Sequence, residues 1–162
     1  TEHLEGITPA NGYDFDLTNR VYRGRNVLSL AEAEDAISIL EAPRPIESNG
    51  AGAEKLLNLG EMILLIQGWP TDDRDNPSDA AYALLAATEQ RLSMISELDS
   101  FGDPKYPDIG FLGVDSEGDR EISEFRIGQG IVRPPQEGVS RLAMFYLPVV
   151  IGVASDHRNP YL

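Results

Sequence analysis

The segment from residue 61 to residue 98 constrains the fold more than any other part of the chain. It opens with the short apolar run Met62-Ile-Leu-Leu-Ile66, which Gly68 and Pro70 close. A short apolar run that ends in Gly and Pro favours a β-strand over a buried helix. Successive strand side chains point to opposite faces, so both faces of this strand are apolar. The sequence therefore predicts a strand in the interior of a sheet.

A helix is predicted over residues 79–98, after an acidic loop at residues 71–78. Ser78 is a suitable N-cap, Pro77 fits a helix start, and Asp79 places a negative charge in the first turn, where the helix dipole favours it. One side of this helix gathers Ala81, Leu84, Leu85, Thr88, Leu92 and Ile95. The opposite side carries Tyr82, Glu89, Ser93 and Glu97, and a flank of mostly small side chains is formed by Ala83, Ala87 and Met94. Strand, loop and helix should form the core that the other strands complete.

The remaining segments supply shorter elements. The patterns predict a turn or two of helix at 1–7, a turn at 8–12, strands at 13–17, 20–30 and 35–43, a flexible loop at 46–58, a long irregular acidic segment at 99–121, and strands at 122–132 and 142–154. The strand at 13–17 is predicted because Tyr13, Phe15 and Leu17 alternate with acidic residues. Pro148 lacks a backbone donor, which places the last strand at a sheet edge or at a bulge.

This order of elements predicts an α+β domain. Its sheet should be mostly antiparallel or mixed, with one long helix packed on one face and a long acidic loop. A length of 162 residues suggests a single domain that can bury a core without disulfides or a metal. No apolar run approaches the roughly 20 residues that span a bilayer, and no secretory signal is visible, so no membrane is expected as a partner.

The net charge of −14 is the strongest feature of the composition. It argues against a protein that grips nucleic-acid phosphates over a broad surface. Two interpretations are open: plain solubility, or a surface that nucleic acid must pass without adhering. The chain contains no cysteine, which excludes disulfide, zinc–thiolate and thiol chemistry.

Residues for catalysis are scarce. His3 and His157 lie near the two ends of the sequence, without the pattern of a triad or a metal site, and are expected to be solvated surface residues. The acidic cluster Asp72, Asp73, Asp75 and Asn76 offers oxygen ligands for a hard cation. It lacks the central glycine and closing glutamate of a calcium loop, so a plain loop before a helix is favoured. No catalytic residue, cofactor or metal is predicted.

Several blocks of sequence, taken in order, resemble the tail terminator (tail completion) proteins of long-tailed bacteriophages. The blocks are Asn11-Gly-Tyr13 with Asp16-Leu17, Val21 with Gly24-Arg25, Ile37-Ser-Ile39 with Glu41, Gly68-Trp69, Asp72-Asp73 with Pro77 and Ala80-Ala-Tyr-Ala-Leu-Leu85, and Val132-Arg-Pro-Pro135 with Ser140 and Phe145-Tyr-Leu-Pro-Val149. Together they cover most of the chain. The family usually opens with a longer helix, and the short segment before Gly6 suggests that this helix is reduced or missing.

The resemblance implies a structural rather than an enzymatic role. Such proteins assemble as homo-hexameric rings that cap the finished tail tube, end its polymerisation and join it to the head-side connector or stopper protein. It implies location in the virion at the tail–head junction, after assembly in the host cytoplasm. DNA would run through the ring without specific binding, which an acidic lumen would favour.

The resemblance also directs attention to particular side chains. Candidates for protein interfaces are Arg23, Arg25, Trp69, Asp72, Asp73, Tyr106, Arg133 and Tyr146. Candidates for an acidic, DNA-facing surface are Asp115, Glu117, Asp119 and Glu121. Trp69 lies at a strand end, where an anchor for a partner and a packed core position are both open.

Two other functions remain open at this point. One is a neck or head-completion protein, a close relative in the same structural class. The other is a small acidic, cation-dependent enzyme or ligand-binding domain with its site in the loop from Asp72 to Asp75.

Overall fold

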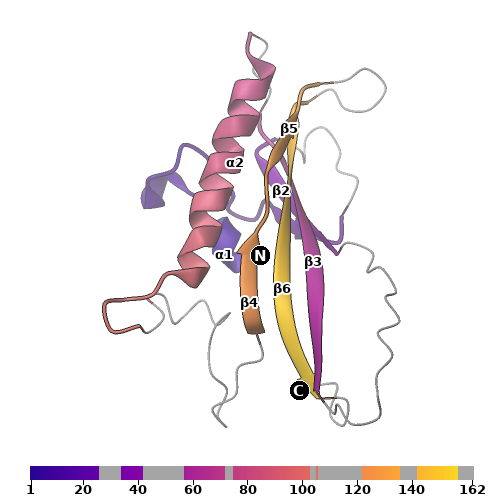
Figure 1. The fold of residues 1–162 in the computed structure, drawn as a ribbon. Coiled ribbons are helices and arrows are strands. Elements are labelled where there is room, and N and C mark those ends of the chain that lie inside the picture. Colours follow the sequence, from indigo (N-terminus) through magenta and orange to yellow (C-terminus); the bar gives the residue numbers. More distant parts are fainter. Residues whose placement is uncertain are drawn as a thin grey trace.

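The computed structural model of the 162-residue chain describes residues 1–25, 34–41, 57–71, 75–102, 105, 122–135 and 142–156. Its elements are α1 (Glu2–Glu5), the 3-10 helix η1 (Pro9–Asn11), β1 (Val21–Arg23), β2 (Ala36–Glu41), β3 (Leu57–Trp69), α2 (Pro77–Ser93), the 3-10 helix η2 (Met94–Ser96), β4 (Ile122–Ile127), β5 (Ile131–Arg133) and β6 (Met144–Asp156). They form one sheet with α2 along one of its faces (Figure 1). The predicted α+β class is confirmed, whereas most of the acidic segment 99–121 lies outside the described residues.

The sheet has the strand order β1-β2-β3-β6-β4, and β5 also pairs with β6. Only β1 and β2 pair in parallel, so the sheet is mixed. β3 lies in its interior, as predicted, between β2 and β6. It begins at Leu57, inside the segment predicted as a loop, because β6 is equally long and pairs with it from Leu57↔Asp156 to Gly68↔Phe145.

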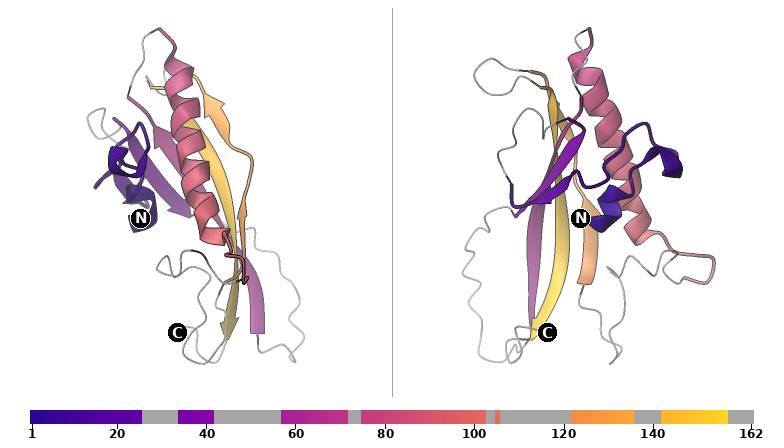
Figure 2. Two further views of the ribbon diagram at one scale, coloured as in Figure 1. Left: turned by 90° about the vertical axis from the view of Figure 1, so that its left-hand side faces the viewer. Right: turned by 180° about the vertical axis from the view of Figure 1, so that it is seen from behind.

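The core lies between α2 and one face of the sheet, and Figure 2 shows the helix crossing that face from two further sides. The helix side chains predicted to face inward are all buried: Ala81, Leu84, Leu85, Thr88, Leu92 and Ile95. The strands bury Ile37, Ile66, Phe145, Leu147, Val149 and Ile151 against the same core. Alternation along the strands places these residues on one face, so α2 and the sheet stabilise each other.

The helix α2 begins earlier than the sequence pattern predicts. Its N-cap is Asn76, and Pro77 is the first helical residue, so Ser78 is not the cap. Proline has no N–H to lose at this position and its fixed φ suits a helix, which explains why the helix starts at the proline. The helix also ends earlier, at Ser93, where the 3-10 turn of η2 replaces it.

No strand forms at residues 13–17, although the burial alternates as predicted. Leu17 is fully buried, Tyr13 and Phe15 are half-buried, and Asp14 and Asp16 are exposed. The Leu17 N–H donates to the carbonyl of Ile7 (2.9 Å), and Thr18 donates to the Asp16 carboxylate (3.0 Å), which lowers the pKa of Asp16. These local bonds turn the chain, so its polar backbone groups are satisfied without a ladder.

The predicted strand at 122–132 is divided into β4 and β5. Ile127 pairs with Val149 and Ile131 pairs with Tyr146, so residues 128–130 face only residues 147 and 148 of β6. The Gly128 N–H donates to the carbonyl of Pro148 (2.8 Å). In an antiparallel ladder the N–H and the C=O of one residue point to the same neighbouring strand. The N–H that Pro148 lacks would therefore point toward residues 128–130, where no strand pairs with it. Of the two positions predicted for Pro148, the structure shows the bulge and not the edge, because β6 is an interior strand that faces an interrupted neighbour.

Candidate functional site

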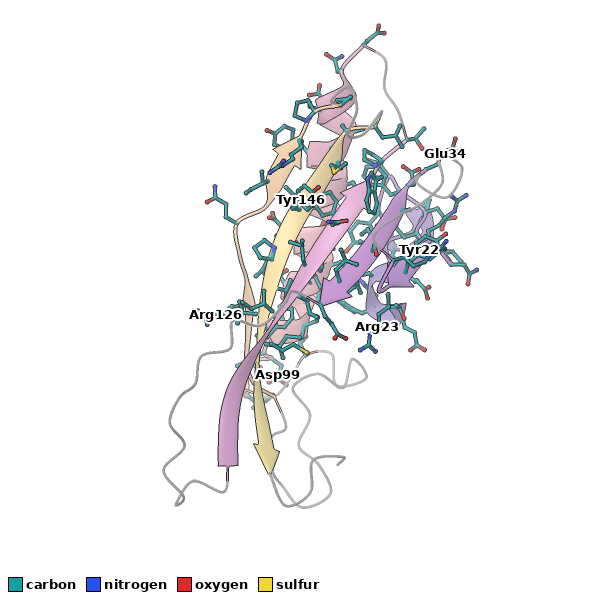
Figure 3. All side chains as sticks on the ribbon, turned by 90° about the vertical axis from the view of Figure 1, so that its right-hand side faces the viewer. Tyr22, Arg23, Glu34, Asp99, Arg126 and Tyr146 are labelled. Atoms are coloured by element: carbon teal, nitrogen blue, oxygen red, sulfur yellow. The ribbon has the colours of Figure 1, made fainter. Side chains whose placement is uncertain are left out.

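The interface candidates within the described residues lie mainly at two opposite edges of the sheet. Arg23 and Arg25 lie at the β1 edge, whereas Arg133 and Tyr146 lie where β5 pairs with β6. Figure 3 views the sheet face opposite α2, with Tyr22 and Arg23 on one side of that face and Arg126 on the other. Candidates outside the described residues are Asp72, Asp73, Tyr106, Asp115, Glu117, Asp119 and Glu121.

The β1 edge carries an arginine–tyrosine contact, here called the β1 patch (Tyr22, Arg23 and Arg25). The Arg25 guanidinium lies over the Tyr22 ring, 4.9 Å from its centroid. Arg23 pairs with Glu41 of β2 at 3.0 Å, and both side chains are well exposed, so this ion pair contributes little to stability. The hydroxyl of Ser38 donates to the carbonyl of Arg25 and holds the end of the patch against β2.

The opposite edge carries a second contact of the same kind, here called the β5 patch (Ile131, Arg133 and Tyr146). The Arg133 guanidinium lies 5.4 Å from the centroid of the Tyr146 ring. Ile131, which pairs with Tyr146, is 55% exposed. Arginine and aromatic residues are enriched in protein interfaces, and a planar guanidinium that stacks on a ring is already ordered before binding.

Ser38 and Gln67 form the row that joins the two patches, and the sheet face beside this row is apolar and half-exposed. Leu40, Leu65 and Pro148 lie side by side across β2, β3 and β6, and Ile63 and Val150 form the next row. All five side chains are of intermediate exposure, whereas the corresponding residues on the α2 side are mostly buried. This face is therefore a surface that a protein contact could cover.

Trp69 is buried at the end of β3, in a small cluster on the same sheet face as Leu65 and apart from the main core. It is 8% exposed and packs with Leu142 and Met144, against which Tyr146 also lies. Of the two roles left open by the sequence, the packed core position fits the structure.

His3 is half-buried and joins α1 to α2, contrary to the expectation of a solvated side chain. Its Nε2 lies 2.5 Å from the carbonyl oxygen of Arg91, which only accepts, so this nitrogen carries the proton. In return, Nε of Arg91 donates to the carbonyl of His3 (2.8 Å). Burial lowers the pKa of His3, and the nearby Arg91 charge lowers it further. His157 lies outside the described residues.

This lowered pKa of His3 predicts a dependence of stability on pH. Between the folded pKa and the ordinary value of 6.5, the unfolded chain binds more protons, so the free energy of unfolding should fall as pH falls through this range. Urea unfolding at pH 5 to 8 should show a steeper slope for the wild type than for His3→Gln, which keeps a donor but does not titrate. Equal slopes for the wild type and His3→Gln would contradict the assignment.

An apolar cavity of about 480 Å³ lies between the two helices and the sheet, here called the α1–α2 cavity. Its walls include Ile39 and Leu64 from the strands and Leu92 and Ile95 from the end of α2 and from η2. Residues 1–4 close one side, with Glu2 and His3 among them, and Arg91 lines the cavity beside them. Within the described part of the chain, the Arg91 guanidinium contacts no carboxylate; it donates to His3 and to the Met94 sulfur.

A built turn follows η2, here called the Phe101 turn (residues 97–102 and 105). The Phe101 N–H donates to the Asp99 carboxylate (2.8 Å), and Gly102 closes the turn at a φ of +89°. Lys105 holds its base through a backbone bond to Glu97 (2.9 Å) and an ion pair with the same residue (2.7 Å). Phe101 at the tip is 90% exposed, so the turn presents a large apolar side chain to its surroundings.

Metal-binding side chains do not gather in the described segments. Among these residues no three His, Asp or Glu side chains lie close enough to hold a metal ion. No helix within them is long and apolar enough to cross a membrane. No protein-family model matches the sequence, and no curated protein matches it. The functional conclusion therefore depends on the surfaces described above.

Proposed function

We propose that this protein is a structural subunit of a bacteriophage virion that closes into a homo-hexameric ring. The ring caps the tail tube, ends its polymerisation and offers its other side to the head-side connector or stopper protein. It acts without catalysis. The sequence resemblance suggests this role, and the arrangement of surfaces on the subunit supports it.

The observation that carries the proposal is the position of the two arginine–tyrosine patches. A closed ring with head-to-tail contacts needs two different patches on each subunit, because patch one of each copy meets patch two of the next. The β1 patch and the β5 patch lie at opposite edges of the same sheet. The half-exposed apolar rows beside them, on the same sheet face, add area that assembly could cover.

Sedimentation velocity and negative-stain electron microscopy of the purified protein test this proposal. We expect the wild type to form rings, and we expect Arg23→Ala and Arg133→Ala each to weaken assembly. Truncation of an interface arginine at a hot spot costs about 2 kcal/mol, or roughly thirtyfold in the dissociation constant. Gln90→Glu, on the exposed side of α2, changes the net charge by the same amount and should assemble normally.

Different results would point to the other functions. A wild-type protein that stays monomeric at every concentration, with a cation-dependent activity, would contradict the ring and favour an enzyme. Phage particles made without the protein separate the two structural roles. Tails of uncontrolled length support the tail terminator, whereas leaking heads beside normal free tails support the neck protein.

The acidic candidates Asp115, Glu117, Asp119 and Glu121 supply a second test of the same role. We propose that they face the lumen and keep phosphates from adhering. Their joint replacement by lysine should create DNA binding and lower infectivity, measured by gel shift and plaque count, while the far-UV circular dichroism stays unchanged. Normal infectivity of the lysine variant would contradict a lumen position.

A further inference from the structure

The same subunit presents an exposed aromatic side chain and an apolar cavity that match in size and charge. We propose that the Phe101 turn of one copy docks into the α1–α2 cavity of a neighbouring copy. The inference rests on the proposed ring and adds a specific contact between its subunits. In this contact Phe101 is the anchor, and the walls lined by Leu64, Leu92 and Ile95 receive it.

The sizes agree. A cavity of about 150 Å³ is enough to bind benzene. The α1–α2 cavity measures about 480 Å³, so it can take the phenyl ring together with part of the turn. Phe101 is already held at the tip of a turn by the Asp99 bond and the Lys105–Glu97 pair, so docking orders few additional groups.

The charges agree as well. Asp99 is exposed and belongs to the same turn as Phe101, so the turn brings a carboxylate with it. The cavity offers the Arg91 guanidinium, which contacts no carboxylate within the described segments. A docked turn would place an acidic partner near a half-buried cation, which is where an ion pair contributes most to specificity.

The directions of the two features favour a contact that repeats from head to tail. The Phe101 turn projects from the end of α2 away from the sheet (Figures 1 and 2). The α1–α2 cavity lies on the other side of the helix, because strands β2, β3, β4 and β6 contribute to its walls. Each copy therefore gives its turn to one neighbour and receives the turn of another, which is a heterologous interface.

Two variants remove one half of the contact each. Phe101→Asp removes the anchor, and Leu64→Trp fills the cavity from a half-exposed wall position. Each should weaken self-association by about tenfold to a hundredfold, the effect of burying one large apolar side chain. Tyr82→Asp, at an exposed aromatic of α2, and Met62→Trp, on the same face of β3, are the controls. Both controls should assemble like the wild type.

Mixing the two variants gives the decisive result. Each variant alone has lost one half of the contact, but the intact turn of Leu64→Trp can enter the intact cavity of Phe101→Asp. At concentrations where each variant alone is monomeric, the mixture should therefore give a 1:1 heterodimer by sedimentation or native mass spectrometry. Folded variants that do not combine, or a Phe101→Asp protein that assembles like the wild type, would overturn the inference.

Cross-linking tests the docking of the Phe101 turn separately from the formation of the ring. The chain has no cysteine, so Phe101→Cys with Ile39→Cys introduces a unique pair. Oxidation should give a covalent ladder on a non-reducing gel, whereas Tyr82→Cys with Ile39→Cys should not. Rings without the ladder would overturn the docking and leave the ring intact. A ladder from open chains without rings would support the docking and overturn the ring.

Discussion

Replacing Phe145 by alanine is expected to lower the free energy of unfolding by about 3–5 kcal/mol. The side chain is fully buried in the core between α2 and the sheet, and a smaller residue there leaves a cavity that its rigid neighbours cannot fill. A typical domain is stable by about 5–15 kcal/mol, so the variant should lie close to its unfolding threshold. Urea unfolding, at a protein concentration where the wild type is monomeric, measures the effect.

Phe101→Ala is the matched control for this prediction. The chemical change is the same, but Phe101 is 90% exposed, so we expect a change of less than about 0.5 kcal/mol. A loss of similar size in the two variants would show that the Phe145 position is not part of a packed core.

Alanine at Gly68 is expected to cost about 1–3 kcal/mol, because it would overpack the same core. A Cβ at this position would lie 2.1 Å from Cε1 of the Phe145 ring, across the β3–β6 ladder where Gly68 pairs with Phe145. The ring is fully buried and cannot swing into solvent. The glycine is therefore needed for space, and thermal or urea unfolding of Gly68→Ala measures the penalty.

A double-mutant cycle with Phe145→Leu checks the cause of this penalty. Leucine removes the ring atoms nearest to the new Cβ, so the double variant should be more stable than the sum of the single losses predicts, by about 1 kcal/mol. Strict additivity would indicate that Gly68→Ala acts through the backbone and not through the ring. At Gly12 the φ is +86° and no atom lies within 4 Å of a new Cβ, so any stability that Gly12→Ala loses comes from the backbone alone. Gly12→Ala therefore shows the size of a backbone penalty without a steric clash.

The burial pattern of the fold could be predicted more fully than its hydrogen bonding. At residues 13–17 the alternation of Tyr13, Phe15 and Leu17 with two aspartates identifies which side chains face the core. It does not show that Leu17 bonds to Ile7 and that Asp16 turns the chain, because both bonds depend on segments brought together by the fold. Hydrophobic periodicity therefore predicts which side chains are buried. It does not predict a strand by itself, because a strand also needs a neighbouring strand to bond with.

The start of β3 was predicted wrongly, because β3 extends back to Leu57 along its long partner β6, and the sequence of β3 alone does not contain this partner. Pro148 predicted an edge or a bulge because proline interrupts a ladder. The structure shows the bulge: Gly128, between β4 and β5, lies opposite the proline, so an interior position is tolerated.

The interface candidates Arg23, Arg25, Arg133 and Tyr146 stay predictions, and only the sheet order shows that they occupy two separate edges. Phe101 was missed within the long acidic segment. Its neighbours gave a usable indication, because Asp99 two residues before it and Gly102 directly after it are typical of a tight turn. The α1–α2 cavity depends on six distant segments and has no local pattern.

The interrupted edge formed by β4 and β5 affects how readily strands of other molecules can add to the sheet. Its register shifts between Ile122 and Glu124 and again between Ile127 and Ile131, so the outer backbone groups do not form one straight row. A straight, continuous row would invite strands of other molecules to add without limit, as in fibrils. Because this margin is broken, it is a poorer template for strand addition than a straight edge of the same length would be.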